Sequence, residues 1–163
     1  MLQYEDHGVI IMSKRKELIN YINEELKNID GSRSSYGDQS YIYGINLYRR
    51  VERRLVTIEE ELNFPSLYTT VGNEFRYYNS AGFTEGDISI RLVGYLQDIE
   101  ENLRPLRDSF VQDIEHVIYN MSYKPELGME DLYIDQISTD EGEFELLGYS
   151  VIEVTLTLRY KIV

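Results

Sequence analysis

The chain has 163 residues, contains no cysteine and carries a formal net charge of −13. Its length suits one domain with its own hydrophobic core. The lack of cysteine excludes disulfides and thiolate metal sites, and the negative charge argues against a protein that grips nucleic acid. The sequence shows neither the run of about 20 apolar residues that a membrane helix needs nor a signal-peptide pattern. We therefore expect no membrane partner and synthesis in the cytoplasm.

The charge is unevenly distributed along the chain. Residues 1–82 carry 10 basic and 12 acidic side chains, a net charge of −2, whereas residues 83–163 carry 6 and 17, a net charge of −11. An acidic surface is what a channel needs if DNA is to slide through it without binding. Tyrosine occurs 15 times, against 5 phenylalanines and no tryptophan. Tyrosine is enriched in protein interfaces, although it also lines the edges of cores.

The first third of the chain predicts a tail, a helix and a loop. Residues 1–12 form an N-terminal tail. Residues 13–29 repeat apolar side chains at helical spacing, with Ser13 as the N-cap and a glycine just after the last apolar position. Residues 31–44 are rich in tyrosine, serine and glycine, which predicts a long loop or a contact arm.

The middle of the chain predicts a second helix and a hairpin. Residues 46–62 carry apolar side chains at helical spacing, which favours a helix, although the β-branched content near Thr57 favours a strand. Residues 66–75 and 88–96 alternate apolar and polar side chains and predict two strands. The polar stretch between them, residues 76–87, is too long for a tight turn and predicts a projecting hairpin loop.

The last third predicts one helix and two strands. Residues 102–121 have the clearest helical stripe, residues 132–138 form a short strand, and residues 149–162 alternate over the longest run in the chain. With no internal repeat and no linker, we expect one domain over residues 1–163. Its fold class is α+β, with a mostly antiparallel four-stranded sheet, helices packed on one face, and long loops.

The sequence offers no constellation of catalytic or ligand-binding residues. His7 and His116 lack the partners that a metal or catalytic histidine needs, and no nucleophile or phosphate-binding motif is present. The acidic run 140–143 lacks the alternating ligand spacing of a calcium loop, so we interpret it as a solvated turn. We expect no catalytic residue, no metal, no cofactor and no enzymatic activity.

Two groups of residues are candidates for contacts with other proteins. The first is a basic cluster within six residues of an otherwise acidic chain, made of Arg49, Arg50, Arg53 and Arg54. It is either a solvated helix face or a patch that docks on the acidic half of a neighbouring copy. The second group lies in the 76–87 loop and consists of Tyr77, Tyr78 and Phe83.

The order of several short motifs resembles the tail terminator and tail completion proteins of bacteriophages. The resemblance covers residues 45–163. Its parts, as they stand in this chain, are N-F-P-S-L-Y-T-T-V-G-N-E at 63–74, a strand ending in G-Y at 94–95, V-Q-D-I-E at 111–115, T-D-E-G at 139–142 and R-Y at 159–160. The order and spacing of these pieces carry the likeness, since each piece alone is common. Residues 31–44 lie outside the pattern.

This resemblance implies a structural subunit of the virion. Such a subunit assembles with itself into a hexameric ring at the head-proximal end of the tail, stops polymerisation of the tail tube and sometimes of the sheath, and joins the tail to the neck or connector protein. DNA passes through the ring without specific binding. Three alternatives remain at this point: another phage part, such as a neck, head-completion or tail tube protein; a small hydrolase that uses carboxylates; and a generic acidic adaptor domain of a cell.

Overall fold

The computed structural model describes residues 13–29, 47–50, 57, 64–140 and 144–162. These residues form two α-helices, five strands and two short 3-10 helices. In chain order the elements are α1 (Lys14–Leu26), β1 (Leu47–Arg50), β2 (Ser66–Tyr78), β3 (Thr84–Gln97), α2 (Glu100–Asn120), η1 (Pro125–Leu127), β4 (Met129–Thr139), η2 (Glu145–Leu147) and β5 (Tyr149–Lys161).

All five strands belong to one sheet, in the order β1-β2-β3-β5-β4. Strands β2, β3, β5 and β4 pair antiparallel, and β1 pairs parallel to the start of β2. The predicted α+β fold with a mostly antiparallel sheet is therefore confirmed, and β1 is added as a short fifth strand. One line of paired residues crosses the four long strands at Glu74, Ile88, Leu158 and Leu132.

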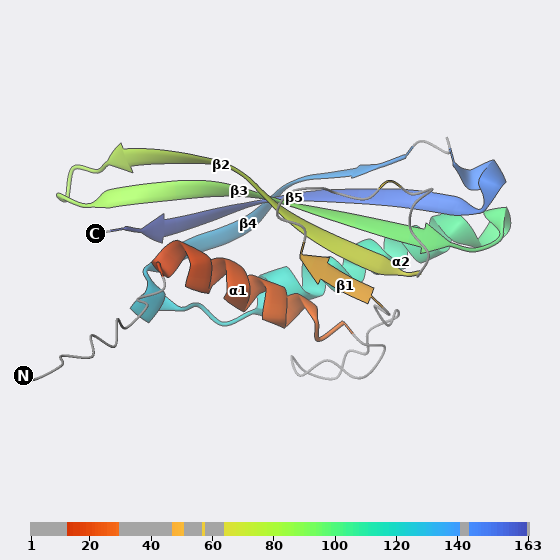
Figure 1. The fold of residues 1–163 in the computed structure, drawn as a ribbon, viewed down its shortest axis with the longest axis horizontal. Helices are drawn as coiled ribbons and strands as arrows, with labels where there is room; N and C mark the ends of the chain where they lie inside the picture. The colour runs from red at the N-terminus through yellow and green to blue at the C-terminus, as the bar shows by residue number, and fades with distance from the viewer. Residues whose placement is uncertain (1–12, 30–46, 51–56, 58–63, 141–143, 163) are drawn as a thin grey trace, which may run out of the picture.

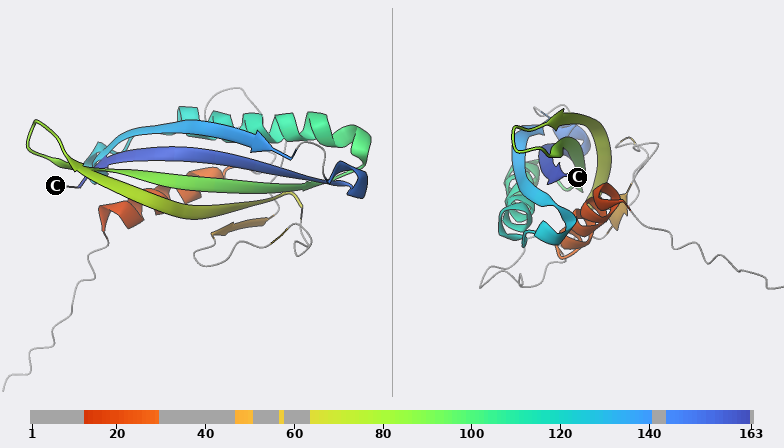
Figure 2. Two further views of the ribbon diagram at one scale, coloured as in Figure 1. Left: turned by 90° about the horizontal axis from the view of Figure 1, so that it is seen from above. Right: turned by 90° about the vertical axis from the view of Figure 1, so that its left-hand side faces the viewer.

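Both helices cover the same face of the sheet (Figure 1). Helix α2 lies along the β4 side, and α1 lies beside it toward β2 (Figure 2). The apolar stripes predicted for the helices are buried, as Leu18 in α1 and Phe110 in α2 show, and they pack against the alternating apolar face of β5. Ser13 accepts a hydrogen bond from the backbone N–H of Lys16 at 3.3 Å, so the predicted N-cap is also confirmed.

A second, smaller apolar cluster lies on the opposite face of the sheet. It centres on Tyr68, Val93 and Tyr95, all buried, and the rings of Tyr68 and Tyr95 are 5.8 Å apart. Both faces of β3 are covered in this region, so residues 92–96 are buried without alternation. Burial on both faces therefore replaces, over residues 92–96, the alternation that the sequence predicts for residues 88–96.

The helix predicted over residues 46–62 is wrong where the structure describes it. Residues 47–50 form β1, which is paired with residues 66–69 of β2, and Thr57 is not helical. The rest of that range lies outside the described residues. The spacing of apolar residues within one segment does not reveal a parallel partner strand that lies 19 residues further along the chain. Pairing with β2 therefore overrides the helical pattern.

The loop predicted over residues 76–87 is also wrong in extent. Residues 76–78 belong to β2 and residues 84–87 belong to β3, so the connection spans only residues 79–83. The two strands therefore form a long hairpin that extends past the start of α1 (Figure 1). Its side chains are largely exposed on both faces, which hides the alternation that would have marked them as strand.

A β-bulge interrupts β2 between Val71 and Glu74. Three residue steps of β2 there oppose two steps of β3, from Ile90 to Ile88. Before the bulge, odd-numbered residues of β2 such as Leu67 face the helices; after it, even-numbered residues such as Glu74 do.

Candidate assembly surface

The outer part of the β2–β3 hairpin, residues 74–87, is here called the arm. A side-chain-supported turn closes its tip. The Oδ1 atom of Asn79 accepts hydrogen bonds from the backbone N–H groups of Ala81 and Phe83 at 3.0 and 3.1 Å, and Gly82 adopts a φ of 87°. Asparagine and glycine are suited to these roles, because the first bonds to the backbone locally and the second tolerates positive φ. The tip is therefore a defined turn.

A set of interacting side chains around an ion pair links the helix-free face of the arm to β5. Arg159 of β5 donates from Nε and from Nη2 to the two carboxylate oxygens of Asp87 in β3, at 2.9 and 3.0 Å. The hydroxyl of Tyr77 lies 3.4 Å from the same carboxylate, and its ring faces the Arg159 guanidinium at 6.0 Å. The hydrogen bonds from Arg159 hold the pKa of Asp87 below its usual range.

A second charged group anchors the helix-facing side of the arm. Glu74 accepts hydrogen bonds from the Tyr160 hydroxyl at 3.0 Å and from Arg76 Nε at 2.7 Å, and Arg15 of α1 forms an ion pair with it at 2.7 Å. Desolvation raises the pKa of Glu74, but the hydrogen bonds from Arg76 and Tyr160 outweigh it, so the net shift is downward. Three separate elements thus converge on one carboxylate.

The arm gathers the three aromatic residues that the sequence singles out. Tyr77 packs over Arg159, and the ammonium of Lys161 lies 3.1 Å from the centre of the Phe83 ring. Tyr78 is 75% exposed and Phe75, which the sequence analysis missed, is 69% exposed. Large apolar side chains exposed together on one projecting element indicate a contact surface.

The predicted arginine cluster does not join these aromatic residues. Arg49 and Arg50 lie in β1, beside Tyr68 and Thr69 of β2, and Arg53 and Arg54 fall outside the described residues. Tyr77 is eight residues further along β2, roughly 25 Å at the rise of a strand. Arg49 and Arg50 therefore lie at the opposite end of the sheet from the aromatic residues of the arm.

At the end of the sheet away from the arm, a buried arginine joins α2 to the connection between β4 and β5. Arg107 is 8% exposed; it donates to the backbone oxygen of Asp140 at 3.2 Å and to Glu145 at 3.3 Å. Asp140 in turn accepts hydrogen bonds from the Ser150 hydroxyl and from the Val151 N–H. Sequence reasoning missed Arg107, whose only signal is a charge on the apolar side of the helix.

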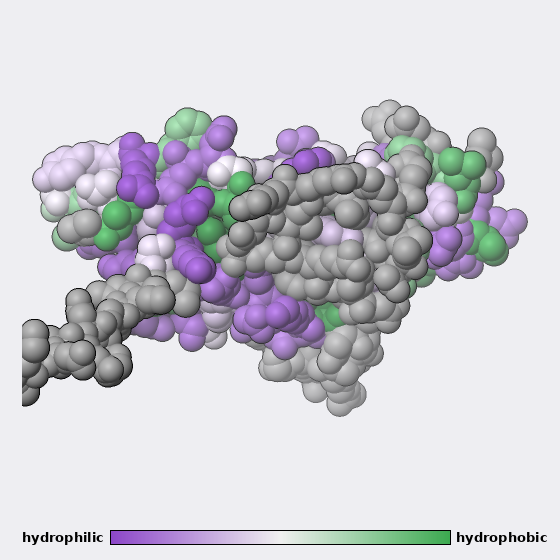
Figure 3. Space-filling view, in the orientation of Figure 1, coloured by the Kyte–Doolittle hydropathy of each residue, from purple (hydrophilic) through white to green (hydrophobic). Residues whose placement is uncertain are grey.

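Two other features bear on function. Among the described residues, no group of three or more histidines or acids is placed to hold a metal ion. No helix in the described part of the chain is long and apolar enough to cross a membrane. The space-filling view shows residues of intermediate hydropathy at the end of the arm, next to a strongly hydrophilic band (Figure 3).

Comparison with known proteins identifies relatives of this chain. A family model described as Bacteriophage Tail Tube Terminator Protein matches residues 12–162, a range that contains every helix and strand described above. The chain is also 31% identical over 144 residues to the tail tube terminator protein p142 of Escherichia phage T5. That match covers 80% of this chain and 86% of the phage T5 protein.

Proposed function

Because the chain belongs to the bacteriophage tail tube terminator family, we propose that six copies form a ring that caps the head-proximal end of the tail tube. Membership makes the protein a structural component of the phage tail and not an enzyme. In the proposed role, the ring ends polymerisation of the tube, and of a sheath where one is present, and offers its other side to the neck. The virion assembles in the host cytoplasm.

The observation that carries this proposal is the arm. It is a long hairpin with a defined tip, anchored on both faces by charged groups, and it presents exposed aromatic side chains beyond the helices. A rigid projection that displays large apolar side chains loses little conformational entropy when a partner covers them. We assign the arm to contacts with neighbouring proteins of the tail, the tube protein among them.

The helix-free face of the sheet is the proposed wall of the DNA channel. Among the described residues, the charged side chains of this face include Glu85, Asp87, Glu130, Asp131, Asp135 and Glu153 against Arg91, Arg159 and Lys161. Arg91 and Arg159 are each paired with a carboxylate, Glu153 and Asp87 respectively. A wall with an acidic excess and paired arginines repels a duplex weakly and does not hold it.

The arginine cluster is proposed as a second contact. Arg49 and Arg50 are the last two residues of β1. With Arg53 and Arg54 they supply positive charge to a chain whose second half is strongly acidic. The proposed partner is the acidic surface of a neighbouring copy or of an adjacent tail protein.

Electron microscopy and a tube-assembly assay together test the proposed function. The purified protein should form an annulus with six-fold symmetry and a central hole, and adding it to elongating tail tubes should stop their growth at one end. Growth of tubes to unchanged length, with the protein bound to neither end, would contradict the terminator role for this chain.

A further inference from the structure

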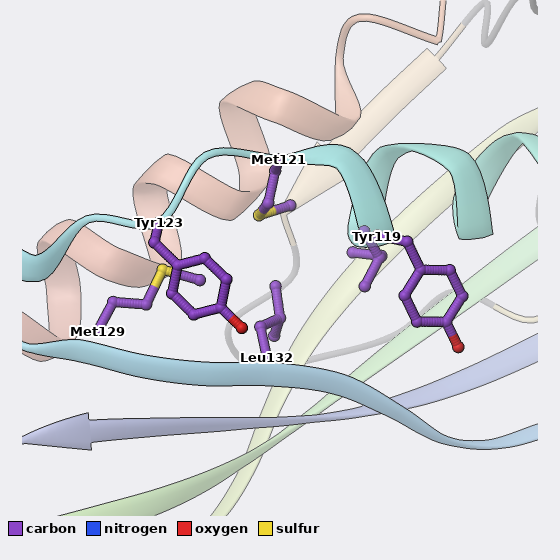
Figure 4. Close-up of a pocket in the computed structure, with 6 residues that line it drawn as sticks. Tyr119, Met121, Tyr123, Met129 and Leu132 are labelled. Carbon is purple, nitrogen blue, oxygen red and sulfur yellow. The ribbon is translucent and has the colours of Figure 1, made fainter. Parts of the chain in front are cut away.

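A small pocket of about 100 Å³ lies between the end of α2 and strand β4 (Figure 4). It is lined by Ile118, Tyr119, Met121, Tyr123, Met129 and Leu132. Met129 and Leu132 are buried, whereas Tyr119 and Tyr123 are exposed. On its side away from β5, β4 pairs with no strand among the described residues. We call β4 and these pocket residues the β4 margin.

The opposite side of the sheet has a complementary character. From Val71 to Tyr78, β2 pairs with β3 on one side and has no strand partner on the other in the part of the chain that the structure describes. This stretch, the β2 margin, carries Phe75 and Tyr78. The register after the bulge directs Tyr78 to the helix-facing side, which is also the side of the pocket, and Phe75 to the helix-free side.

We propose that the β2 margin of one copy packs on the β4 margin of a second copy, with Tyr78 at the pocket and Phe75 beside Tyr133. This contact rests on the proposed ring and specifies its subunit interface. It is a head-to-tail contact between two different surfaces, which is the type that closes into a ring by rotation.

The two margins lie at matching positions along the strand direction. Arg76 pairs with Gly86, Gly86 with Tyr160, and Tyr160 with Met129, so Arg76 and Met129 lie at the same level on opposite edges. A rotation axis parallel to the strands preserves that level. It therefore brings the outer part of β2 in one copy against the start of β4 in the next.

The directions of the strands agree as well. Three antiparallel pairings separate β2 from β4, so the two edge strands run in opposite directions. Rotation about an axis parallel to the strands does not change strand direction. Strand β2 of one copy would then run antiparallel to β4 of its neighbour, the same arrangement that holds the sheet together within each copy.

Charge and size also favour a second copy over an unrelated partner. The β4 margin is acidic, with Glu130, Asp131 and Asp135, and Glu126 lies just before it. The β2 margin has Arg76, and the exposed Lys14 and Lys16 lie at the start of α1, which the ion pair of Arg15 with Glu74 places next to β2. Opposite charges favour a second copy as the partner. The pocket, at about 100 Å³, is smaller than the ~150 Å³ cavity that admits a benzene ring, so the ring of Tyr78 is placed over the pocket and not inside it.

Two margin variants and a control test the interface by sedimentation velocity over a range of concentrations. The first variant, F75S/Y78S, removes the aromatic side chains of the β2 margin. The second, Y119R/Y133R, places charge on the β4 margin at two exposed positions. The control, I99S/L147S, changes two exposed apolar residues at the far end of the sheet.

Each margin variant should associate at least roughly 30-fold more weakly than the unmodified chain, as truncation of a central interface aromatic does. The control should assemble normally. Mixing the two margin variants should give heterodimers, because each retains the margin that the other lacks, and should give no rings. Circular dichroism should show the same fold for all variants.

The outcomes separate the interface from the proposed function. If the unmodified chain forms rings and both margin variants form them equally well, the interface is wrong and the ring stands. If the unmodified chain stays monomeric, with and without tail tubes, the ring itself is wrong. Normal rings from the variants with loss of tube capping would show that the margins contact the tube protein, which also overturns the proposal.

Discussion

Arg159 and Asp87 form a two-pronged ion pair that joins β5 to β3 within the arm, with donor–acceptor distances of 2.9 and 3.0 Å. Because the pKa of Asp87 is lowered in the folded state, its contribution to stability is full above the unfolded pKa of about 3.9 and is lost as the pH falls through the folded value. The pair therefore makes the arm sensitive to acid and insensitive to alkali.

Replacing Asp87 with asparagine should cost about 1 kcal/mol at neutral pH, a value discounted because the Arg159 side chain is 39% exposed. Urea unfolding of D87N and of the unmodified chain should show this difference at pH 7 and a smaller one as the pH falls through the lowered pKa of Asp87. The control is E24Q, which removes an exposed helix pair with Lys27. A D87N effect that is independent of pH would show that charge is not the cause.

Gly94 should not tolerate alanine. A Cβ atom at this position would lie 2.4 Å from Cε1 of Phe110, so α2 or the ring must move. We expect G94A to destabilise the protein by about 1–3 kcal/mol, the usual cost of overpacking a core. Thermal and urea unfolding measure it. In the double variant with F110L, the loss should be smaller than the sum of the two single losses, and simple additivity would refute the contact as the cause.

Reversing the arginine cluster to R49E/R50E/R53E/R54E should weaken assembly, and more so at low salt, where screening is least. Single substitutions should have little effect, because an exposed ion pair contributes only ~0.2–1 kcal/mol. Sedimentation at several salt concentrations measures the change. The charge-preserving control is R49K/R50K/R53K/R54K. Unchanged assembly of the reversed variant would return the cluster to the interpretation of a solvated surface.

Adding positive charge to the proposed channel wall should make rings retain DNA. Ser89 and Thr155 lie on the helix-free face of β3 and β5, near the middle of the sheet. Rings of S89K/T155K should bind linear duplex with an affinity that falls steeply with salt, whereas unmodified rings and the neutral S89Q/T155Q control should not. A filter-binding titration near physiological salt decides it. Tight binding by unmodified rings would mean that the channel wall is not the acidic face.

The elements that the sequence predicts well are those whose pattern is local. The stripe around Leu18 and the one around Phe110 identify both helices, and β5 alternates because one of its faces is buried along its whole length. The same reasoning does not predict strand β1, because this strand forms only through its pairing with β2. The family could be recognised without β1 because the order of short motifs in residues 45–163 does not depend on its conformation.

The contact surface is only partly visible in the sequence. Tyr77, Tyr78 and Phe83 can be identified because they cluster in a polar stretch, although the strand that carries Tyr77 and Tyr78 cannot. The pocket could not be found, because Ile118 and Leu132 come together only when α2 and β4 are in place. Phe75 was missed for a related reason: only the register after the bulge, which turns it to the helix-free face, marks it as exposed.

At the bulge between Val71 and Glu74, the number of residues in β2 affects the structure independently of which residues they are. Removing one residue from 72–73 would restore a regular ladder and leave the later side chains of β2 on their present faces, because Glu74 would still pair with Ile88. The strand would lose the local bend and added twist that a bulge gives. A one-residue deletion at this point should therefore change the direction in which the arm projects and keep the side chains that each of its faces presents. Aligned family members should conserve the residue count here more strictly than the residues themselves.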